Sequence, residues 1–364
     1  MNFLKNIAVL FRQYLFPAGE SMVAVDLHAA EFRVIELAKK SDQYIVENLF
    51  CYQLNSGTPS ELETIGFEDK SAAFKKIVEE LGLTGRPVCS SVSNALVMSK
   101  IIELSATLSP VEIEHQVMLE IDRFVPYPIE EISFDYEIQG DSGEGEGQIN
   151  VLLVASRREN TDDQVAVLSA AGLKPVILDV DVYAMERAFS LLVGQLPESV
   201  LEKPVAIYDF RGNSVTLYVM CGERNIYMRE QNLGSQQIKK ESHSFYEPET
   251  SLSGKGSEED LIQADNSVAI INNAVVIQQV LRGLQFYEAA NINDPVGHIV
   301  LAGDVAVNND IDEAIKQQVG LAISIADPFK EMVVSKRIDT LDLTPSLFMI
   351  TCGLALRGFV NGAH

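Results

Sequence analysis

Two stretches of the sequence repeat one pattern, an apolar strand that ends in an acidic residue and is followed by a second strand. Met22 to Asp26 has its partner strand at Phe32 to Leu37, and Val205 to Asp209 has its partner at Ser214 to Cys221. Short apolar runs of this kind, bounded by turn residues, are typical of buried strands. The repeat therefore predicts two similarly built lobes of mixed α/β structure.

Between the two repeats lies a predicted helix that ends at a rigid corner. Ser109, Pro110 and Glu112 form a capping box that starts the helix, and apolar residues recur after it at helical spacing. The helix must end before Pro126, because the residue ahead of a proline is driven out of the α region. Pro126 and Pro128 then make a stiff, extended corner. We interpret this stretch as the centre of a small inserted subdomain.

The surrounding pattern predicts that this α+β subdomain covers about residues 94–180. A Gly-rich acidic loop joins two of its strands, and a second capping box is predicted from Thr161 and Gln164. Besides the helix that starts at Ser109, its predicted elements are strands at 97–104, 132–138 and 149–155, a helix from 161 and a closing strand at 176–180.

Composition excludes several classes of function. The chain has 364 residues, of which 47% are hydrophobic, enough for about two domains. Its net charge of −24 argues against nucleic acid as a partner, because phosphate-binding faces need clustered Lys and Arg. No C-x-x-C motif or suitable histidine spacing occurs, so the sequence predicts reduced cysteines, no metal site and no catalytic residues. No apolar run is long enough to span a bilayer.

Residues 1–16 form a basic, apolar segment at the start of an acidic chain. The segment carries Lys5 and Arg12 and no acid, and its apolar residues fall at helical spacing. A signal peptide is not expected, because Arg12 interrupts the apolar stretch. Two interpretations stay open: a helix packed on the rest of the protein, or an amphipathic segment that contacts an anionic membrane surface.

The octapeptide from Phe124 to Glu131 resembles the tyrosine-flanked diproline motif of the PilM family. This family is the actin-like cytoplasmic component of type IV pilus assembly and is related to the cell-division protein FtsA. Further stretches resemble the family in the same order, at 155–160, 326–329 and 345–357. The resemblance extends from about Met22 to about Phe359. It implies an actin-like fold with two ribonuclease H-like lobes and the inserted α+β subdomain.

These expectations divide the chain into five parts. The polar stretch 234–262 has few apolar residues and predicts a mobile loop within the second lobe. The expected parts are an amphipathic segment at 1–19, the first lobe at 20–93, the inserted subdomain at 94–180, a closing helix of the first lobe at 181–203 and the second lobe at 204–364.

The first nucleotide loop of the family reads Asp-Ile-Gly followed by two Ser or Thr residues. Glycine there lets backbone amides approach phosphate. This sequence keeps Asp26, but His28 stands in place of the glycine, and Ala29 and Ala30 replace the hydroxyl residues. The next residue, Glu31, would repel phosphate unless a metal ion intervened, or would simply cap a turn.

The two other nucleotide loops expected from the resemblance differ from the family in the same direction. Arg211 replaces a glycine after Asp209, although Gly212 remains, and Asp304 follows Gly303 where the family has a run of glycines. We therefore expect no cofactor, with ATP and Mg²⁺ as the alternative. The degenerate nucleotide-binding residues would be Asp26, His28, Asp209, Gly212 and Gly303.

Two classes of function remain. The resemblance implies a non-enzymatic scaffold on the cytoplasmic face of the inner membrane, where a groove between the first lobe and the inserted subdomain receives the tail of a PilN-like protein. The alternative is an ATP-binding, ATP-gated filament-forming protein of the FtsA kind, or a weak ATPase. Because all three nucleotide loops have lost glycine or hydroxyl groups, the sequence favours the scaffold. Other expected partners are further pilus platform proteins and a second copy of this chain.

The expected partner-binding residues belong to the proline corner, which we define as Phe124, Pro126, Tyr127 and Pro128. The two prolines fix the backbone of the corner, so peptide binding would cost little entropy for ordering it. The edge of the predicted strand at 97–104 would offer backbone groups to an extended peptide. The alternative for Tyr127 is that its ring only packs in the core of the subdomain.

Overall fold

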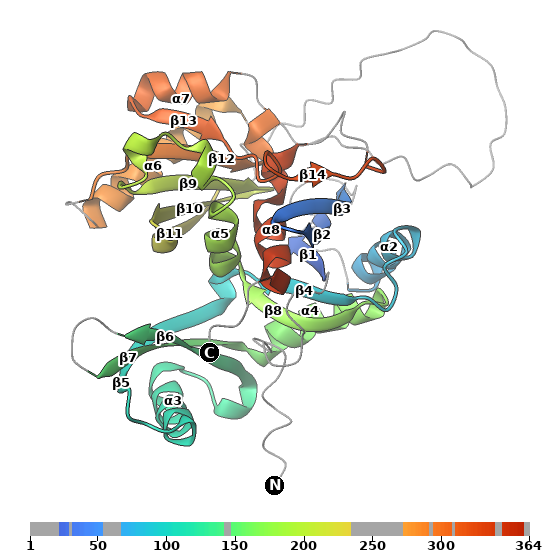
Figure 1. Cartoon of the computed structure of the whole chain (residues 1–364), viewed down its shortest axis with the longest axis vertical. Helices are drawn as coiled ribbons and strands as arrows, with labels where there is room; N and C mark the ends of the chain where they lie inside the picture. Colours follow the sequence, from blue (N-terminus) through green and yellow to red (C-terminus); the bar gives the residue numbers. More distant parts are fainter. Residues whose placement is uncertain are drawn as a thin grey trace, which may run out of the picture.

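A computed structural model describes residues 22–28, 31–53, 67–141, 147–233, 272–290, 294–307, 310–338 and 344–359. The expected amphipathic segment at 1–19 and the expected mobile loop at 234–262 lie outside these residues. The described elements form two lobes and a smaller subdomain that extends away from them (Figure 1).

The first lobe is built on a six-stranded sheet. Helices α2 (Phe67–Glu80) and α4 (Arg158–Ala170) cover one face, where their apolar side chains join those of the strands in one core. The sheet order is β14 (Val333–Val334), β3 (Gln43–Gln53), β2 (Glu31–Lys40), β1 (Val23–His28), β4 (Pro87–Val92) and β8 (Lys174–Val180).

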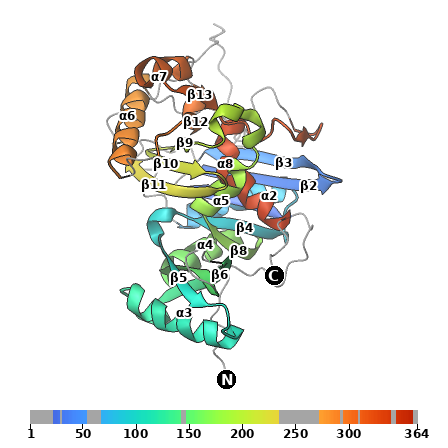
Figure 2. The same ribbon diagram turned by 60° about the vertical axis from the view of Figure 1, so that its left-hand side comes forward.

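The second lobe has a five-stranded sheet with helices α6 (Asn273–Ala290) and α7 (Ile311–Val319) on its outer face (Figure 2). The repeated sequence pattern is confirmed, because β1 and β9 each pair antiparallel with the next strand and parallel with a later one. The sheet order is β11 (Arg224–Asn232), β10 (Ser214–Cys221), β9 (Val205–Arg211), β12 (His298–Gly303) and β13 (Ala322–Ile325).

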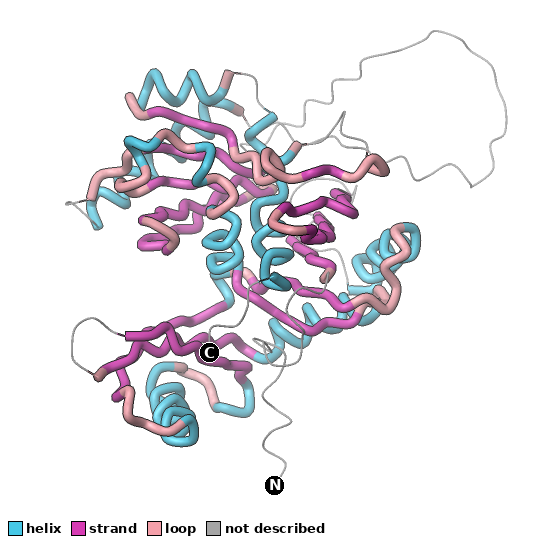
Figure 3. The backbone as a smooth tube through the Cα atoms, viewed as in Figure 1, coloured by secondary structure: helices cyan, strands magenta, loops and turns pink. Residues whose placement is uncertain are grey.

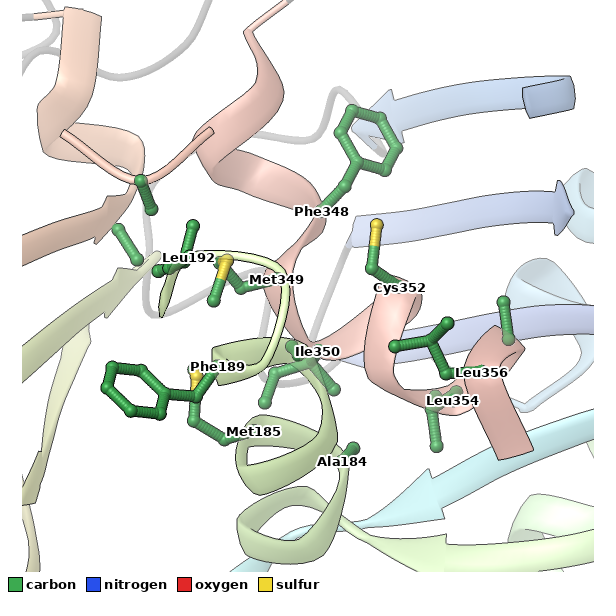
Figure 4. Packing of buried hydrophobic residues seen from close by; sticks show 14 of the residues in the cluster. Ala184, Met185, Phe189, Leu192, Phe348, Met349, Ile350, Cys352, Leu354 and Leu356 are labelled. Atoms are coloured by element: carbon green, nitrogen blue, oxygen red, sulfur yellow. The ribbon is translucent and has the colours of Figure 1, made fainter. Parts of the chain in front are cut away.

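Two helices, α5 (Asp181–Phe189) and α8 (Met349–Leu356), lie between the sheets (Figure 3). Their side chains form one core with apolar residues from both sheets, and Figure 4 shows part of it. Arg187 of α5 donates a hydrogen bond from Nε to the carbonyl of Gly353 on α8, at 2.9 Å. The lobes therefore share one hydrophobic core between their sheets, besides the separate core on the outer face of each.

The inserted subdomain is a three-stranded antiparallel sheet with a helix on one face. Strand β7 (Gln148–Arg157) lies between β5 (Val97–Ser105) and β6 (Ile132–Asp141), and α3 (Pro110–Phe124) packs on the sheet. The predicted capping box is confirmed, because Ser109 and Glu112 exchange backbone-to-side-chain hydrogen bonds. Short 3-10 helices complete the elements: η3 (Asn94–Leu96), η4 (Ile129–Glu131), η5 (Val193–Gln195), η6 (Glu198–Val200), η7 (Asp304–Val307), η8 (Pro345–Phe348) and η9 (Arg357–Phe359).

The expected boundaries of the inserted subdomain need correction at the C-terminal end. Strand β8 pairs parallel with β4, and α4 packs beside α2, so both belong to the first lobe and not to a subdomain at 94–180. The insertion ends at Arg157. The second predicted capping box is also wrong, because α4 begins at Arg158 and the hydroxyl of Thr161 donates to the carbonyl of Arg158 inside the helix.

The expected limits of the second lobe, 204–364, also need correction. Strand β14 pairs with β3 in the first sheet, and α8 packs against β1 and β2 as well as α5. The chain therefore returns to the first lobe after β13. Apolar side chains of α8 are buried all around the helix, which requires neighbours on every side.

Candidate functional site

Charged side chains from both lobes meet in the interior, where the strands β1 and β9 end. We call these residues the interlobe cluster. Each residue is at most 9% exposed. Carboxylates and guanidinium groups are rarely so buried unless they are paired. The members are the acids Asp26, Glu31, Asp181, Asp209 and Asp304 and the arginines Arg33 and Arg211.

Arg211, at the end of β9 in the second lobe, reaches into the first lobe. Its Nη1 lies 3.2 Å from Asp26 Oδ2, and its Nη2 donates to Asp181 Oδ2 at 2.8 Å. Its Nε forms an ion pair with Asp209 on the same strand, at 3.1 Å. One guanidinium group therefore contacts three carboxylates and connects the lobes.

Arg33, on β2 of the first lobe, reaches in the opposite direction. Its Nη2 lies 2.5 Å from Glu31 Oε2 and donates to Asp304 Oδ1 of the second lobe at 3.2 Å. The hairpin register places Arg33 directly opposite Asp26. The arginines of the two lobes thus cross, and each one pairs with acids of the other lobe.

The interlobe cluster has five carboxyl groups and two guanidinium groups, and this excess of acids affects the pKa values of the carboxyl groups. Burial raises the pKa of Asp304 to about 7, and neighbouring Glu31 acts in the same direction while Arg33 opposes it. Burial also raises the pKa of Asp181 and of Asp209, against the effect of Arg211. The excess of buried acids therefore makes added phosphate charge unfavourable at this place.

Gly212 is one of the residues expected to approach a phosphate, and its backbone amide is already used. The amide of Gly212 donates to Asp304 Oδ2 at 2.7 Å. Its φ of +55° is a conformation that favours glycine. Asp304 stands where the family has a glycine in the third loop. Its side chain therefore also accepts the hydrogen bond of the Gly212 amide in the second loop.

Gly303 is required by backbone packing. Its φ is +77°, and a Cβ built there would lie 1.9 Å from the carbonyl oxygen of Phe210 on the neighbouring strand β9. No side chain fits between these strands. Of the other expected residues, Asp26 and Asp209 belong to the interlobe cluster, and His28 ends β1 opposite Glu31. The structure thus brings Asp26, Asp209, Gly212 and Gly303 together, at a place where this chain's own arginines pair with the acids.

Arg33 and Asp181 are members of the cluster that the sequence did not single out. A signal for Arg33 was present, because antiparallel pairing of the first two predicted strands places it opposite Asp26 in an apolar strand. Asp181 had no comparable signal, since an acid at the first position of a helix is a common favourable arrangement.

Two features are absent from the described part of the chain. No group of three or more His, Cys, Asp or Glu residues is arranged to hold a metal ion there. Within the same residues, no helix is long and apolar enough to cross a bilayer.

The proline corner divides between the inside and the outside of the inserted subdomain. Phe124 is half-buried against the subdomain core, with Lys100 Nζ 5.9 Å from its ring centroid. Pro126, Tyr127 and Pro128 are exposed. Tyr127 keeps 38% of its surface exposed, and the guanidinium of Arg157 lies 5.1 Å from its ring centroid. Tyr127 is therefore on the surface, which excludes the interpretation that its ring only packs in the core.

Strand β5 lies at an edge of the inserted sheet, and its one partner among the described strands is β7. Ile101 on this strand is 53% exposed, and Leu96 just before it is 47% exposed. An edge strand with unpaired backbone groups is a common place for an extended peptide to bind.

The family model for type IV pilus assembly protein PilM matches residues 24–359. The chain belongs to the PilM family. Similar solved structures include a PilM-PilN type IV pilus biogenesis complex, whose matched chain is 20% identical with a TM-score of 0.66; the match covers 94% of this chain and 100% of that chain. The actin-like fold expected from the resemblance is confirmed.

Two further solved structures are similar over most of their length. One is a Bacteroides thetaiotaomicron protein described as having an actin-like ATPase fold, with 9% identity, a TM-score of 0.42 and coverage of 89% of this chain and 94% of that chain. The other is MreB 5 of Spiroplasma citri bound to AMPPNP, with 11% identity, a TM-score of 0.40 and coverage of 93% and 95%.

Proposed function

We propose that this PilM-family protein is a scaffold of the type IV pilus platform whose lobes are held together without a nucleotide. The observation that carries the proposal is the interlobe cluster. Arg211 and Arg33 join the lobes by ion pairs with Asp26 and Asp304, and Asp304 accepts the hydrogen bond of the Gly212 amide that a phosphate group would need. We infer a non-enzymatic function, because the charged side chains at this place are paired with one another and with a backbone amide.

The proposed partner is the cytoplasmic N-terminal tail of a PilN-like membrane protein. A solved relative is a PilM-PilN complex, which supports this class of partner. On this chain, Tyr127 and the flanking prolines supply an exposed, rigid apolar surface, and β5 supplies an open strand edge. Binding a membrane-anchored tail would hold the protein at the cytoplasmic face of the inner membrane.

We expect Tyr127→Ala to weaken binding of a synthetic PilN-like tail peptide by about tenfold or more, because buried aromatic residues dominate small interfaces. Fluorescence anisotropy with the labelled peptide measures this. Leu201→Ala is the matched control, since Leu201 is similarly exposed at 39% but lies in another part of the chain. Equal affinity of the Tyr127 variant and wild type would place the peptide elsewhere, and a wild type that binds no peptide would refute this part of the proposal.

The alternative function, ATP binding with ATP-gated filament formation, has a direct test by thermal shift. A ligand at a hundredfold excess over its Kd stabilises a protein by about 2.7 kcal/mol. We expect millimolar ATP with Mg²⁺ to leave the melting temperature unchanged, because Asp304 already occupies the Gly212 amide and the buried acids disfavour phosphate. A clear increase for wild type that is lost in Asp26→Ala would favour the alternative instead.

Other partners remain proposals that rest on sequence. The basic segment at 1–16 would add peripheral membrane contact, and other platform proteins or a second copy of this chain could bind elsewhere. Affinity purification from the membrane fraction identifies these partners directly.

A further inference from the structure

The first two turns of α5 contact all three parts of the molecule. Val182 and Tyr183 pack against β7 of the inserted subdomain. Asp181 pairs with Arg211 of the second lobe. Glu186 Oε1 accepts a hydrogen bond from the backbone amide of Asn225 on β11, at 2.7 Å. Movement of the second lobe would therefore act on α5 and on the surface that supports the inserted sheet.

Asn94 connects the same three parts through one side chain. It lies in η3, the segment that leads from β4 of the first lobe into β5 of the inserted subdomain. Its Oδ1 accepts from the backbone amide of Val182 at 2.9 Å, and its Nδ2 donates to the hydroxyl of Tyr218 at 3.1 Å. Tyr218 belongs to β10 of the second lobe and is fully buried.

The apolar contact between the inserted subdomain and the first lobe involves few residues. It has three buried residues, Leu152, Val154 and Val180, with a few partly buried neighbours. Polar contacts of α4 add to it, such as that between Ser133 Oγ and Thr161 Oγ1 at 3.0 Å. The chain crosses the boundary in two short segments, at η3 and at Arg157 to Arg158. A subdomain joined through two short segments can change its orientation when contacts at the boundary are lost.

We propose that Asn94 and Tyr218 are positioning residues that couple the second lobe to the orientation of the inserted subdomain, and so to its binding of the partner tail. Tyr218 lies beside the interlobe cluster, where Asp181 and Arg211 are its charged neighbours. The hydroxyl of Tyr218 holds Asn94, and Asn94 fixes the connection into β5. The part of this proposal that concerns the tail rests on the proposed function.

The coupling can be tested in the absence of the tail peptide, by measuring the distance between the second lobe and α3. Cys221 is exposed at the end of β10, and a second label can be placed at the exposed position His115 by His115→Cys in a Cys51→Ala background. Cys89 and Cys352 are buried. Electron paramagnetic resonance of the spin-labelled full chain then gives the distribution of distances.

Two pairs of variants separate positioning from stability. Tyr218→Phe removes one hydroxyl, and the matched control Tyr208→Phe removes another buried hydroxyl, which donates to the carbonyl of Val280 within the second lobe at 2.8 Å. Asn94→Ala removes both hydrogen bonds of Asn94. Asn94→Asp is the rescue, because a carboxylate accepts from both the Val182 amide and the Tyr218 hydroxyl.

We expect Tyr218→Phe and Asn94→Ala to broaden or shift the distance distribution, while Tyr208→Phe and Asn94→Asp match wild type. The PilN-like tail peptide should bind about two- to tenfold more weakly to the first two variants, which corresponds to one or two hydrogen bonds. A Tyr218→Phe distribution identical to wild type overturns the coupling. A changed distribution with unchanged peptide affinity overturns its link to the partner surface. If wild type binds no peptide, the proposed function fails while the distances still decide the coupling.

Discussion

Arg211→Ala is expected to lower the free energy of unfolding by about 3–5 kcal/mol, because it leaves buried carboxylates without their shared cation. Arg211 contacts Asp26, Asp181 and Asp209, and its own side chain is 5% exposed. Denaturant unfolding at neutral pH measures the loss. Arg224→Ala removes an exposed arginine of the same lobe and should cost no more than about 0.5 kcal/mol.

The defect of Arg211→Ala should also depend on pH in a defined direction. Burial already raises the pKa of Asp181 and Asp209 in the folded protein, and loss of Arg211 raises both values further. A carboxyl group whose pKa is higher in the folded state binds its proton more tightly there, so stability is lost as the pH rises through that range. The variant should therefore lose less stability at pH 5.5 than at pH 8. An equal loss at both pH values would contradict this assignment of the charges.

The double variant Arg211→Ala with Asp181→Asn separates lost packing from unpaired charge. The amide keeps the volume of Asp181 and removes one buried negative charge, so part of the stability should return. No recovery would mean that the Arg211 side chain contributes through packing alone.

The sequence predicted the two lobes because their cause is local. Each lobe begins with an apolar strand, a tight turn and a partner strand, and such pairs need few distant contacts to form. The capping box of α3 is equally local, as Ser109 and Glu112 bond to each other's backbone amides. Both predictions are confirmed.

The boundaries were harder to predict because they depend on pairing between distant strands. The pattern from residue 158 to 180 reads as a helix and a strand in either subdomain, and only the parallel pairing of β8 with β4 assigns it to the first lobe. The predicted capping box at Thr161 and Gln164 is wrong for the same reason, because distant contacts decide the role of Gln164. Gln164 fits a capping box by spacing, but its amide donates to Ser90 Oγ and to the carbonyl of Ser91 on β4.

The sequence predicted three loops that differ from the family pattern. It did not predict the ion pairs that their residues form between the lobes. Comparison with the family pattern identifies Arg211 and Asp304 as substitutions for glycine. It does not show that Arg211 pairs with acids of the other lobe, since those contacts join residues far apart in the sequence.

Helices α5 and α8 touch at Gly353, and this contact makes Gly353→Ala the other substitution with a large expected effect. A Cβ at Gly353 would lie 1.8 Å from the carbonyl oxygen of Ala184. Because main-chain atoms of a helix cannot turn aside as a side chain can, the helices must separate. The shared core around Ala184 and Ile350 would then lose its packing (Figure 4).

We expect Gly353→Ala to cost at least about 3 kcal/mol of stability, the upper range for overpacking in a core. Thermal unfolding of the purified variant measures this. Gly194→Ala is the matched control, because its Cβ would meet the flexible end of Glu331 at 3.0 Å, and it should cost less than about 1 kcal/mol. Ala184→Gly should not rescue Gly353→Ala, since the obstacle is the carbonyl oxygen of Ala184 and not its methyl group. Rescue by Ala184→Gly would show instead that side-chain contact sets the spacing of the two helices between the lobes.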